Sequence, residues 1–430
     1  MDFHIFIYIA VLLLAALLST RLMKIFKLPN VTGYIVTGIV MGPFVFGLLF
    51  NNFTYEGIKD SPIYLYIDKI KWVSTIALGF IAFSIGTSFK KSVLKTVGKR
   101  VMIITVLEAL FASIFVIAAL VGVHFIFPEQ VSWELVLTLG AIAAATAPAA
   151  TLMVIKQYRA RGPLVDTLLP VVALDDAAAL ILFAVLFQIA MTMAGGGSFD
   201  VYKMIVKPIL EIIISLSIGV AFGFLISFMN KFFKSRNNRL IICIFSIFAC
   251  CGLYYLFKSK YLGGFELSSL LMCMMVGAIY TNLRDDSGKT LDVMDRFTSP
   301  IYLMFFVISG ASLDLTIFFN KNGLIVIGIA LVYIIFRVVG KWTGAFTGAS
   351  ISNCEPKVKK YLGFALIPQA GVAIGLATTA NTLFLSHPNT EVAGTMVIAI
   401  ILTSTLVYEL IGPLVSKFAL KKAGEIPENE

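Results

Sequence analysis

The chain has 430 residues, of which 59% are hydrophobic and only 13% are charged. This composition is far more apolar than that of an average soluble domain, so it excludes a soluble protein and predicts a polytopic membrane protein. The formal charge of +10 is carried mostly by loops between apolar segments, and we do not expect nucleic-acid binding from it.

Apolar segments long enough to cross a bilayer recur almost without interruption, because about 20 helical residues span about 30 Å of hydrocarbon. We therefore predict an all-α chain of thirteen transmembrane helices with no soluble domain between them. The predicted spans are residues 3–20, 31–50, 72–89, 101–127, 134–155, 163–194, 208–229, 240–257, 264–281, 299–319, 324–350, 361–383 and 391–416.

The distribution of Lys and Arg predicts the orientation of these spans, because basic residues collect in cytoplasmic loops. Twenty-four of the 34 basic residues lie in one alternate set of connections and eight in the other; the remaining two, Arg337 and Lys341, lie inside the eleventh span. The first span has no basic residue before it and is followed by Arg21, Lys24 and Lys27. We predict a multi-pass protein of the cell membrane with its N-terminus outside and its C-terminus in the cytoplasm, and no cleaved signal.

Thirteen spans divide into six, one and six, and an odd linking helix inverts the second six relative to the first, as in inverted-repeat transporters. In this register the fifth span, with Pro148, matches the twelfth span, with Pro368. A proline near mid-membrane breaks the helical hydrogen-bond ladder and frees backbone groups. Two broken helices at matching places point to the transport site.

Two adjacent carboxylates, Asp175 and Asp176, lie in the middle of the apolar sixth span, where a charge is costly and usually functional. With a rise of about 1.5 Å per residue, Thr146, Asp176 and Lys341 each lie about 15–20 Å from the cytoplasmic face, near the midplane. Neighbouring helical residues point about 100° apart, so one aspartate can pair with Lys341 while the other faces a cavity.

A hard monovalent cation would bind to carboxylate oxygens, freed carbonyls and a hydroxyl such as that of Thr146. Loss of a proton from the carboxyl and entry of the cation then compete at one place, which is the physical basis of an exchanger. The alternatives are a purely structural polar pair, a structural counter-ion at Lys341 and a threonine bonded to its own helix.

Other residues of the membrane segments are weaker candidates. Glu108 and Glu409 are expected to lie a turn or two inside the cytoplasmic ends of their spans and to be solvated at the interface. Arg337, one turn from Lys341, could substitute for it, pair elsewhere or face a cytoplasmic vestibule.

The cysteines and histidines have no metal-ligand spacing, so we expect no cofactor and no metal site besides the monovalent cation at Asp176. Glycines at every fourth position of the eleventh span allow a neighbouring backbone to approach closely, namely Gly340, Gly344 and Gly348.

Together, four features resemble the monovalent cation/proton antiporters of the NapA-like branch, which are related to KefC-type exchangers. They are the Asp175-Asp176 pair, the Thr146-Ala147-Pro148 break, the lysine in Gly340-Lys341-Trp342-Thr343-Gly344, and the proline-broken twelfth span. The resemblance covers essentially the whole membrane chain. It implies a NapA/NhaA-like fold of two inverted six-helix repeats with crossed, broken helices. It also implies that Asp176 binds the ion and the proton, that Asp175 pairs with Lys341, and that Thr146 belongs to the crossing segment.

The resemblance further implies antiport of Na⁺, with Li⁺ and K⁺ as alternatives, for H⁺ by an elevator-type movement in a homodimer. The implied domains are dimerisation helices one to three (1–90), core helices four to six (91–200), a linker helix (201–235), dimerisation helices eight to ten (236–322) and core helices eleven to thirteen (323–423). Gln369 stands where some relatives have an acidic residue, so ion selectivity is left open.

Four rival functions share parts of this pattern. A K⁺/H⁺ exchanger would use the same site, and an organic-anion/Na⁺ symporter shares the inverted-repeat plan but needs no buried lysine beside two acids. An intramembrane aspartyl protease requires carboxylates from different helices, and here they are neighbours on one. A cation channel favours rings of acidic or carbonyl groups around a pore. An enzyme is therefore not expected.

Overall fold

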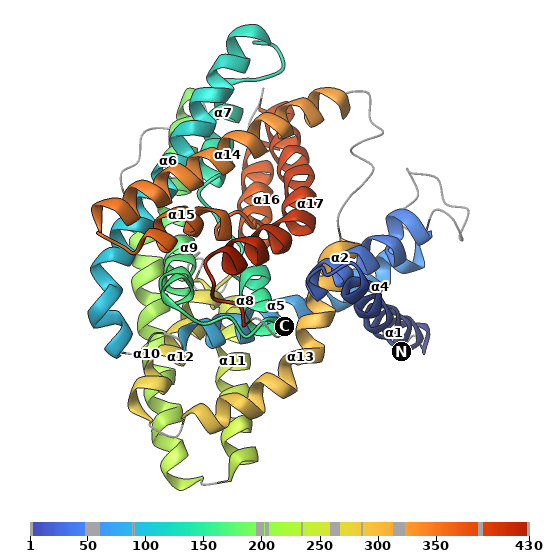
Figure 1. Cartoon of the computed structure of the whole chain (residues 1–430). Helices are drawn as coiled ribbons and strands as arrows, with labels where there is room; N and C mark the ends of the chain where they lie inside the picture. The colour runs from blue at the N-terminus through green and yellow to red at the C-terminus, as the bar shows by residue number, and fades with distance from the viewer. Residues whose placement is uncertain are drawn as a thin grey trace. The chain divides into compact units, whose positions relative to one another are not determined.

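The computed structural model describes residues 3–47, 61–87, 89, 91–194, 202, 206–233, 235–258, 267–284, 287–312, 323–385 and 390–427. Every regular element in these ranges is a helix, which confirms the all-α prediction. The chain divides into two compact units, Met1–Thr96 with Leu210–Asp314 and Val97–Ile209 with Leu315–Glu430. Figure 1 labels their helices. The dimerisation, linker and core roles assigned from the sequence stay predictions.

In the first unit, pairs of helices approach backbone to backbone at glycines. A Cβ atom at Gly38 would lie 2.1 Å from the carbonyl oxygen of Val307, and one at Gly86 would lie 1.9 Å from that of Met274. Only glycine permits this approach of α2 to α13 and of α5 to α12. The helices of this unit are α1 (Phe3–Ile25), α2 (Asn30–Met41), the π-helix η1 (Pro43–Gly47), α4 (Pro62–Ile70), α5 (Trp72–Gly86), α10 (Lys207–Phe232), α11 (Arg236–Lys258), α12 (Ser269–Leu283) and α13 (Ser287–Ala311).

The second unit contains two interrupted helices and four long ones. Its helices are α6 (Lys91–Ile126), whose first residues fall in the first unit, α7 (Trp133–Ile142), α8 (Pro148–Gln157), α9 (Pro163–Met193), α14 (Gly323–Ile351), α15 (Pro356–Ala365), α16 (Gly371–Leu385) and α17 (Glu391–Lys422). One apolar cluster packs α7, α9, α14, α16 and α17 together, and a second packs α8, α9, α14, α15 and α17.

Each predicted span overlaps a helix or a pair of helices. Nine stretches within the described ranges are long and apolar enough to cross a membrane, so the chain is a multi-pass membrane protein. The exact number of thirteen spans and the inverted repeats stay predictions. The second and tenth predicted ranges run beyond Gly47 and Ser312, and the ninth begins before Leu267; these parts lie outside the described residues.

Three predicted spans begin ten or more residues too late. The helix of the tenth span, α13, starts at Ser287 and not at residue 299, because its first turns carry four charged residues, Lys289, Asp292, Asp295 and Arg296. The third helical stretch starts at Pro62 and not at residue 72, because Asp68 and Lys71 lower the hydropathy although they pair with each other at 2.9 Å. The fourth helix starts at Lys91 and not at residue 101, because a cluster of basic residues occupies its first turns.

Both predicted breaks are present, and they meet. α7 and α8 are separated by residues 143–147, and α15 and α16 by residues 366–370. Ala147 is extended because the residue before Pro148 is disfavoured in the helical region. Its N–H donates to the carbonyl oxygen of Pro368 at 2.8 Å. The two interrupted helices are thus joined at their breaks.

The glycines of α14 bring the backbone of α6 close, as predicted. A Cβ at Gly340, Gly344 or Gly348 would lie 2.6–2.8 Å from a Cα atom of α6. At Gly344, one turn along α14 from Lys341, that atom belongs to Glu108.

Candidate functional site

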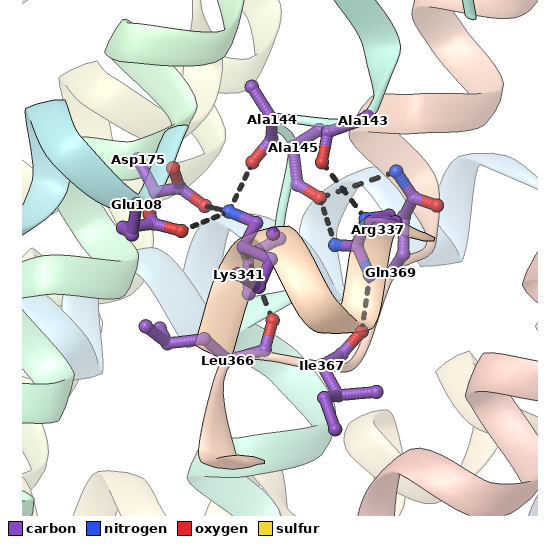
Figure 2. A network of polar contacts seen from close by, with 12 residues as sticks. Glu108, Ala143, Ala144, Ala145, Asp175, Arg337, Lys341, Leu366, Ile367 and Gln369 are labelled. Carbon is purple, nitrogen blue, oxygen red and sulfur yellow. Dashed lines mark hydrogen bonds and ion pairs between the residues drawn. The ribbon is translucent and has the colours of Figure 1, made fainter. Parts of the chain in front are cut away.

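Lys341 lies at the centre of a buried polar cluster. Its Nζ is 2.8 Å from Asp175 Oδ2 and 2.6 Å from Glu108 Oε2, and it donates to the carbonyl oxygen of Ala144 (Figure 2). The side chains of Lys341, Asp175 and Glu108 are all 0% exposed. The structure thus brings Asp175 and Lys341 together, and it adds a second carboxylate on the same ammonium.

The expectation for Glu108 was wrong. Its carboxylate is buried within the second unit and paired with Lys341, not solvated at an interface. The predicted span begins at residue 101, whereas α6 begins at Lys91. With a rise of about 1.5 Å per residue, Glu108 lies about 26 Å along the helix and not about 11 Å. Glu409 is also buried, with 5% of its surface exposed.

Asp176 follows Asp175 on α9 but has different surroundings. Its side chain is 5% exposed, and its Oδ1 atom accepts no hydrogen bond. The lysine therefore pairs with one carboxylate and not with the next, and both aspartates keep a buried Oδ1 without a hydrogen-bond partner. Such an oxygen costs free energy unless a proton or a cation satisfies it.

Thr146 lies within the first break and is 1% exposed. Its hydroxyl donates to the carbonyl oxygen of Leu366, in the second break, over 3.5 Å. The alternative of a threonine bonded to its own helix is therefore wrong. The hydroxyl is the donor in this bond, so the lone pairs of its oxygen remain able to accept a further partner.

Arg337 binds the backbone of both breaks. Its Nε donates to Ala143 at 2.9 Å, its Nη2 to Ala145 at 2.6 Å, and its Nη1 to Ile367 at 2.7 Å (Figure 2). The side chain is fully buried, with its guanidinium 4.7 Å from the centre of the Tyr408 ring. Of the roles weighed for Arg337, pairing elsewhere is the one that the structure bears out, and its partners are carbonyls.

Gln369 is a further polar residue of the crossing, and its role was not foreseen. Its Nε2 donates to the carbonyl oxygens of Ile142 at 3.0 Å and Ala145 at 3.3 Å, and its Oε1 accepts from the Tyr333 hydroxyl at 3.1 Å. An amide next to a membrane proline is a signal that could have indicated this role. Tyr333 carried no such signal, because a tyrosine in an apolar helix is ordinary.

The charges of this cluster do not balance. Asp175, Asp176 and Glu108 carry three negative charges when ionised, against one positive charge on Lys341 and one on Arg337, which is engaged with carbonyls. One additional positive charge, from a proton or a monovalent cation, would balance the count. Within the described residues no group of His, Cys, Asp or Glu is arranged to hold a resident metal ion.

An all-helical membrane protein in which two broken helices meet beside buried charges has the architecture of a secondary transporter. Residues 9–417 match the family described as sodium/hydrogen exchanger, transmembrane, and the chain belongs to this family. Human sodium/hydrogen exchanger 9B2 is 24% identical over 417 residues, which cover 94% of this chain and 73% of the human protein.

Two solved structures have the same fold. Both are of the sodium proton antiporter MjNhaP1 from Methanocaldococcus jannaschii. One, at pH 8, has a TM-score of 0.62 and 19% identity over 98% of this chain and 99% of the other. The other, an electron-microscopy map, has a TM-score of 0.72 and 19% identity over 99% of this chain and all of the other.

Proposed function

We propose that the chain exchanges Na⁺ for H⁺ across the cell membrane, with Asp176 binding the cation and the proton in alternation. The observation that carries this proposal is the contrast within the aspartate pair. Each aspartate has a buried Oδ1 without a hydrogen-bond partner, but Asp175 is held by Lys341 at 2.8 Å through Oδ2, whereas Asp176 forms no ion pair with a described residue. The family and the names of its relatives, a sodium/hydrogen exchanger and a sodium proton antiporter, support cation/proton exchange.

In this mechanism the ion pair of Asp175 and Lys341 keeps the site in place, and Glu108 supplies a second counter-charge to the lysine. Deprotonated Asp176 and the hydroxyl of Thr146 supply hard oxygen ligands for the cation. When a proton binds Asp176, its charge is neutralised and the cation leaves. The two events exclude each other because they use the same oxygen atoms.

An elevator-type movement is part of the proposal. Every residue of the site belongs to the second unit, so one rigid body could carry the cation from one face of the membrane to the other. The homodimer, the cytoplasmic position of the C-terminus, and transport of Li⁺ or K⁺ are proposed from the resemblance and the charge distribution alone.

Of the alternatives, K⁺/H⁺ exchange would use the same atoms and differ only in ion preference. An organic-anion/Na⁺ symporter is disfavoured by the site, because three carboxylates beside one lysine repel an anionic substrate.

Transport by reconstituted protein tests the proposal. In vesicles with an acidic interior, we expect added Na⁺ to dissipate the pH gradient with wild-type protein. Asp176→Asn should reduce the rate to that of protein-free vesicles, because an amide cannot exchange a proton for a cation. Glu391→Gln, at the exposed start of α17, is the matched control and should resemble wild type.

Repeating the assay with Li⁺ and K⁺ gives the ion preference. If none of the three ions dissipates the gradient with folded wild-type protein, the exchanger mechanism is wrong.

A further inference from the structure

The start of α9, the helix that carries Asp176, is capped by a residue from beyond the end of α17. The first N–H groups of a helix need acceptors from outside it. Gly162, at the N-cap, has no side chain to accept, and Pro163 has no N–H. Instead, Glu425 accepts from Leu164 at 2.7 Å through Oε1 and from Val165 at 2.9 Å through Oε2.

Further contacts fix this segment in place. Glu425 is 7% exposed, its N–H donates to Leu420 at 3.0 Å, and its carbonyl oxygen accepts from the N–H of Arg161 at 3.0 Å. Ile426 packs against the apolar cluster at this end of the second unit. Gly162 has φ +150°, and a Cβ there would lie 2.5 Å from Glu425 Cδ. The contact therefore depends on the absence of a side chain at Gly162 in one segment and on the carboxyl of Glu425 in the other.

The same two helices also contact the site. Asp176 lies twelve residues beyond Leu164 on α9, or about 18 Å at a rise of about 1.5 Å per residue. On α17, a Cβ at Gly412 would lie 3.0 Å from a ring atom of Pro368, whose carbonyl joins the two breaks. Glu425 thus ties the cation-binding helix to a helix that packs on the crossing.

We propose that Glu425 is a positioning residue for exchange: it holds the start of α9 to the end of α17, and its protonation makes the maximal rate depend on the pH at the face where it lies. The proposal rests on the proposed function for its effect on transport, whereas the contact itself can be tested without transport. The charge distribution assigns that face to the cytoplasm.

The direction of the pH response follows from the groups around Glu425. Burial raises the pKa of Glu425, the two N–H donors of α9 act in the opposite direction, Asp166 of α9 raises it, and Lys357 of α15 lowers it, with a net increase. A carboxyl whose pKa is higher when docked binds its proton more tightly there. Docking is therefore strongest at low pH and weakens as the pH rises through the raised pKa.

The transport test measures the maximal rate at saturating Na⁺, where competition at Asp176 no longer limits the rate, while the pH on the tail side is varied. The maximal rate of wild type should change as the pH rises and the contact loosens. Glu425→Gln, which cannot ionise, should lose this response, and Glu425→Asp should keep it. The matched control Glu428→Gln removes a carboxyl three residues along the chain and should resemble wild type. Identical pH profiles of the maximal rate in wild type and Glu425→Gln would overturn the proposal.

Hydrogen exchange at the amides of Leu164 and Val165 tests the contact directly. After correction for the intrinsic rates, protection should fall with rising pH in wild type and Glu425→Asp, and it should be independent of pH in Glu425→Gln. Constant protection in wild type across the range would contradict the proposal. Wild type and Glu425→Asp decide the matter if Glu425→Gln does not fold, and the readout remains valid even if no cation exchange is found.

Discussion

At the scale of single residues, the central feature is an ammonium shared by two carboxylates. Removing a charged group from water costs several kcal/mol, and a buried ion pair offsets this only when its geometry is good. Lys341 meets that condition, with contacts of 2.8 Å to Asp175 and 2.6 Å to Glu108. We therefore expect Lys341 to serve the stability of the second unit as well as the proposed exchange.

Replacing the lysine should expose this dual role. Lys341→Met leaves two buried carboxylates without a counter-charge, and we expect destabilisation of about 3–5 kcal/mol. Adding Glu108→Gln should restore part of the lost stability, because one of the unpaired charges is then removed. Thermal unfolding in detergent measures both effects. An unchanged melting temperature in Lys341→Met would show that the three charges are not coupled.

Part of this site could be predicted from the sequence. The depths of the aspartate pair and of Lys341 within apolar segments were enough to predict that one aspartate pairs with the lysine, because each needs a counter-charge. That this aspartate is Asp175 was implied by the resemblance. The pairing of Glu108 was not predicted. The basic residues in the first turns of α6 led the predicted span to begin ten residues too late, so the predicted position of Glu108 was too near the membrane interface. The contact of Glu108 with Lys341 also depends on the close approach of α6 to α14. The spacing of the glycines in the sequence predicts such an approach but does not identify the helix that packs against them.

At the scale of elements, Arg337 takes the place of missing helical hydrogen bonds. The prolines predict the breaks, and the freed carbonyls of Ala143, Ala145 and Ile367 need donors. A guanidinium supplies several donors in one fixed plane. The sequence could not identify this partner, because the three carbonyls come from two segments more than 200 residues apart that meet only in the folded unit.

A lysine should not replace this arginine. In Arg337→Lys the charge remains, but one ammonium cannot reach all three carbonyls in the geometry of the fork. We expect a lower melting temperature and a lower transport rate, each close to that of Arg337→Met. Full activity in Arg337→Lys would mean that only the charge matters.

At the scale of the whole chain, the helix pairs support the inverted repeats. A relation of the first six spans to the last six matches the second span with the ninth and the third with the tenth. In this relation α2 corresponds to α12, and α13 corresponds to α5. The pair of α2 and α13 therefore corresponds to the pair of α12 and α5, and in both pairs the helices approach each other at glycines. The repeats stay a prediction, which these pairs favour.

The predicted orientation can be tested by labelling. The five native cysteines are buried and can be replaced. In that background, cysteine at exposed Glu129, between α6 and α7, should react with an impermeant maleimide added to intact cells. Cysteine at exposed Lys421, near the end of α17, should react only after the cells are opened. The reverse pattern would invert the topology and place Glu425 on the outer face.

Proton release on cation binding tests most directly whether Asp176 binds the cation and the proton in alternation. Titration calorimetry of detergent-solubilised protein with Na⁺, in buffers of different ionisation enthalpy, counts the protons released. We expect one proton per Na⁺ in wild type at pH values where Asp176 is protonated, with an apparent Kd that rises about tenfold for each unit of pH decrease. Asp176→Asn should give neither binding heat nor proton release. Na⁺ binding to wild type without proton release, or unchanged binding to Asp176→Asn, would contradict the mechanism.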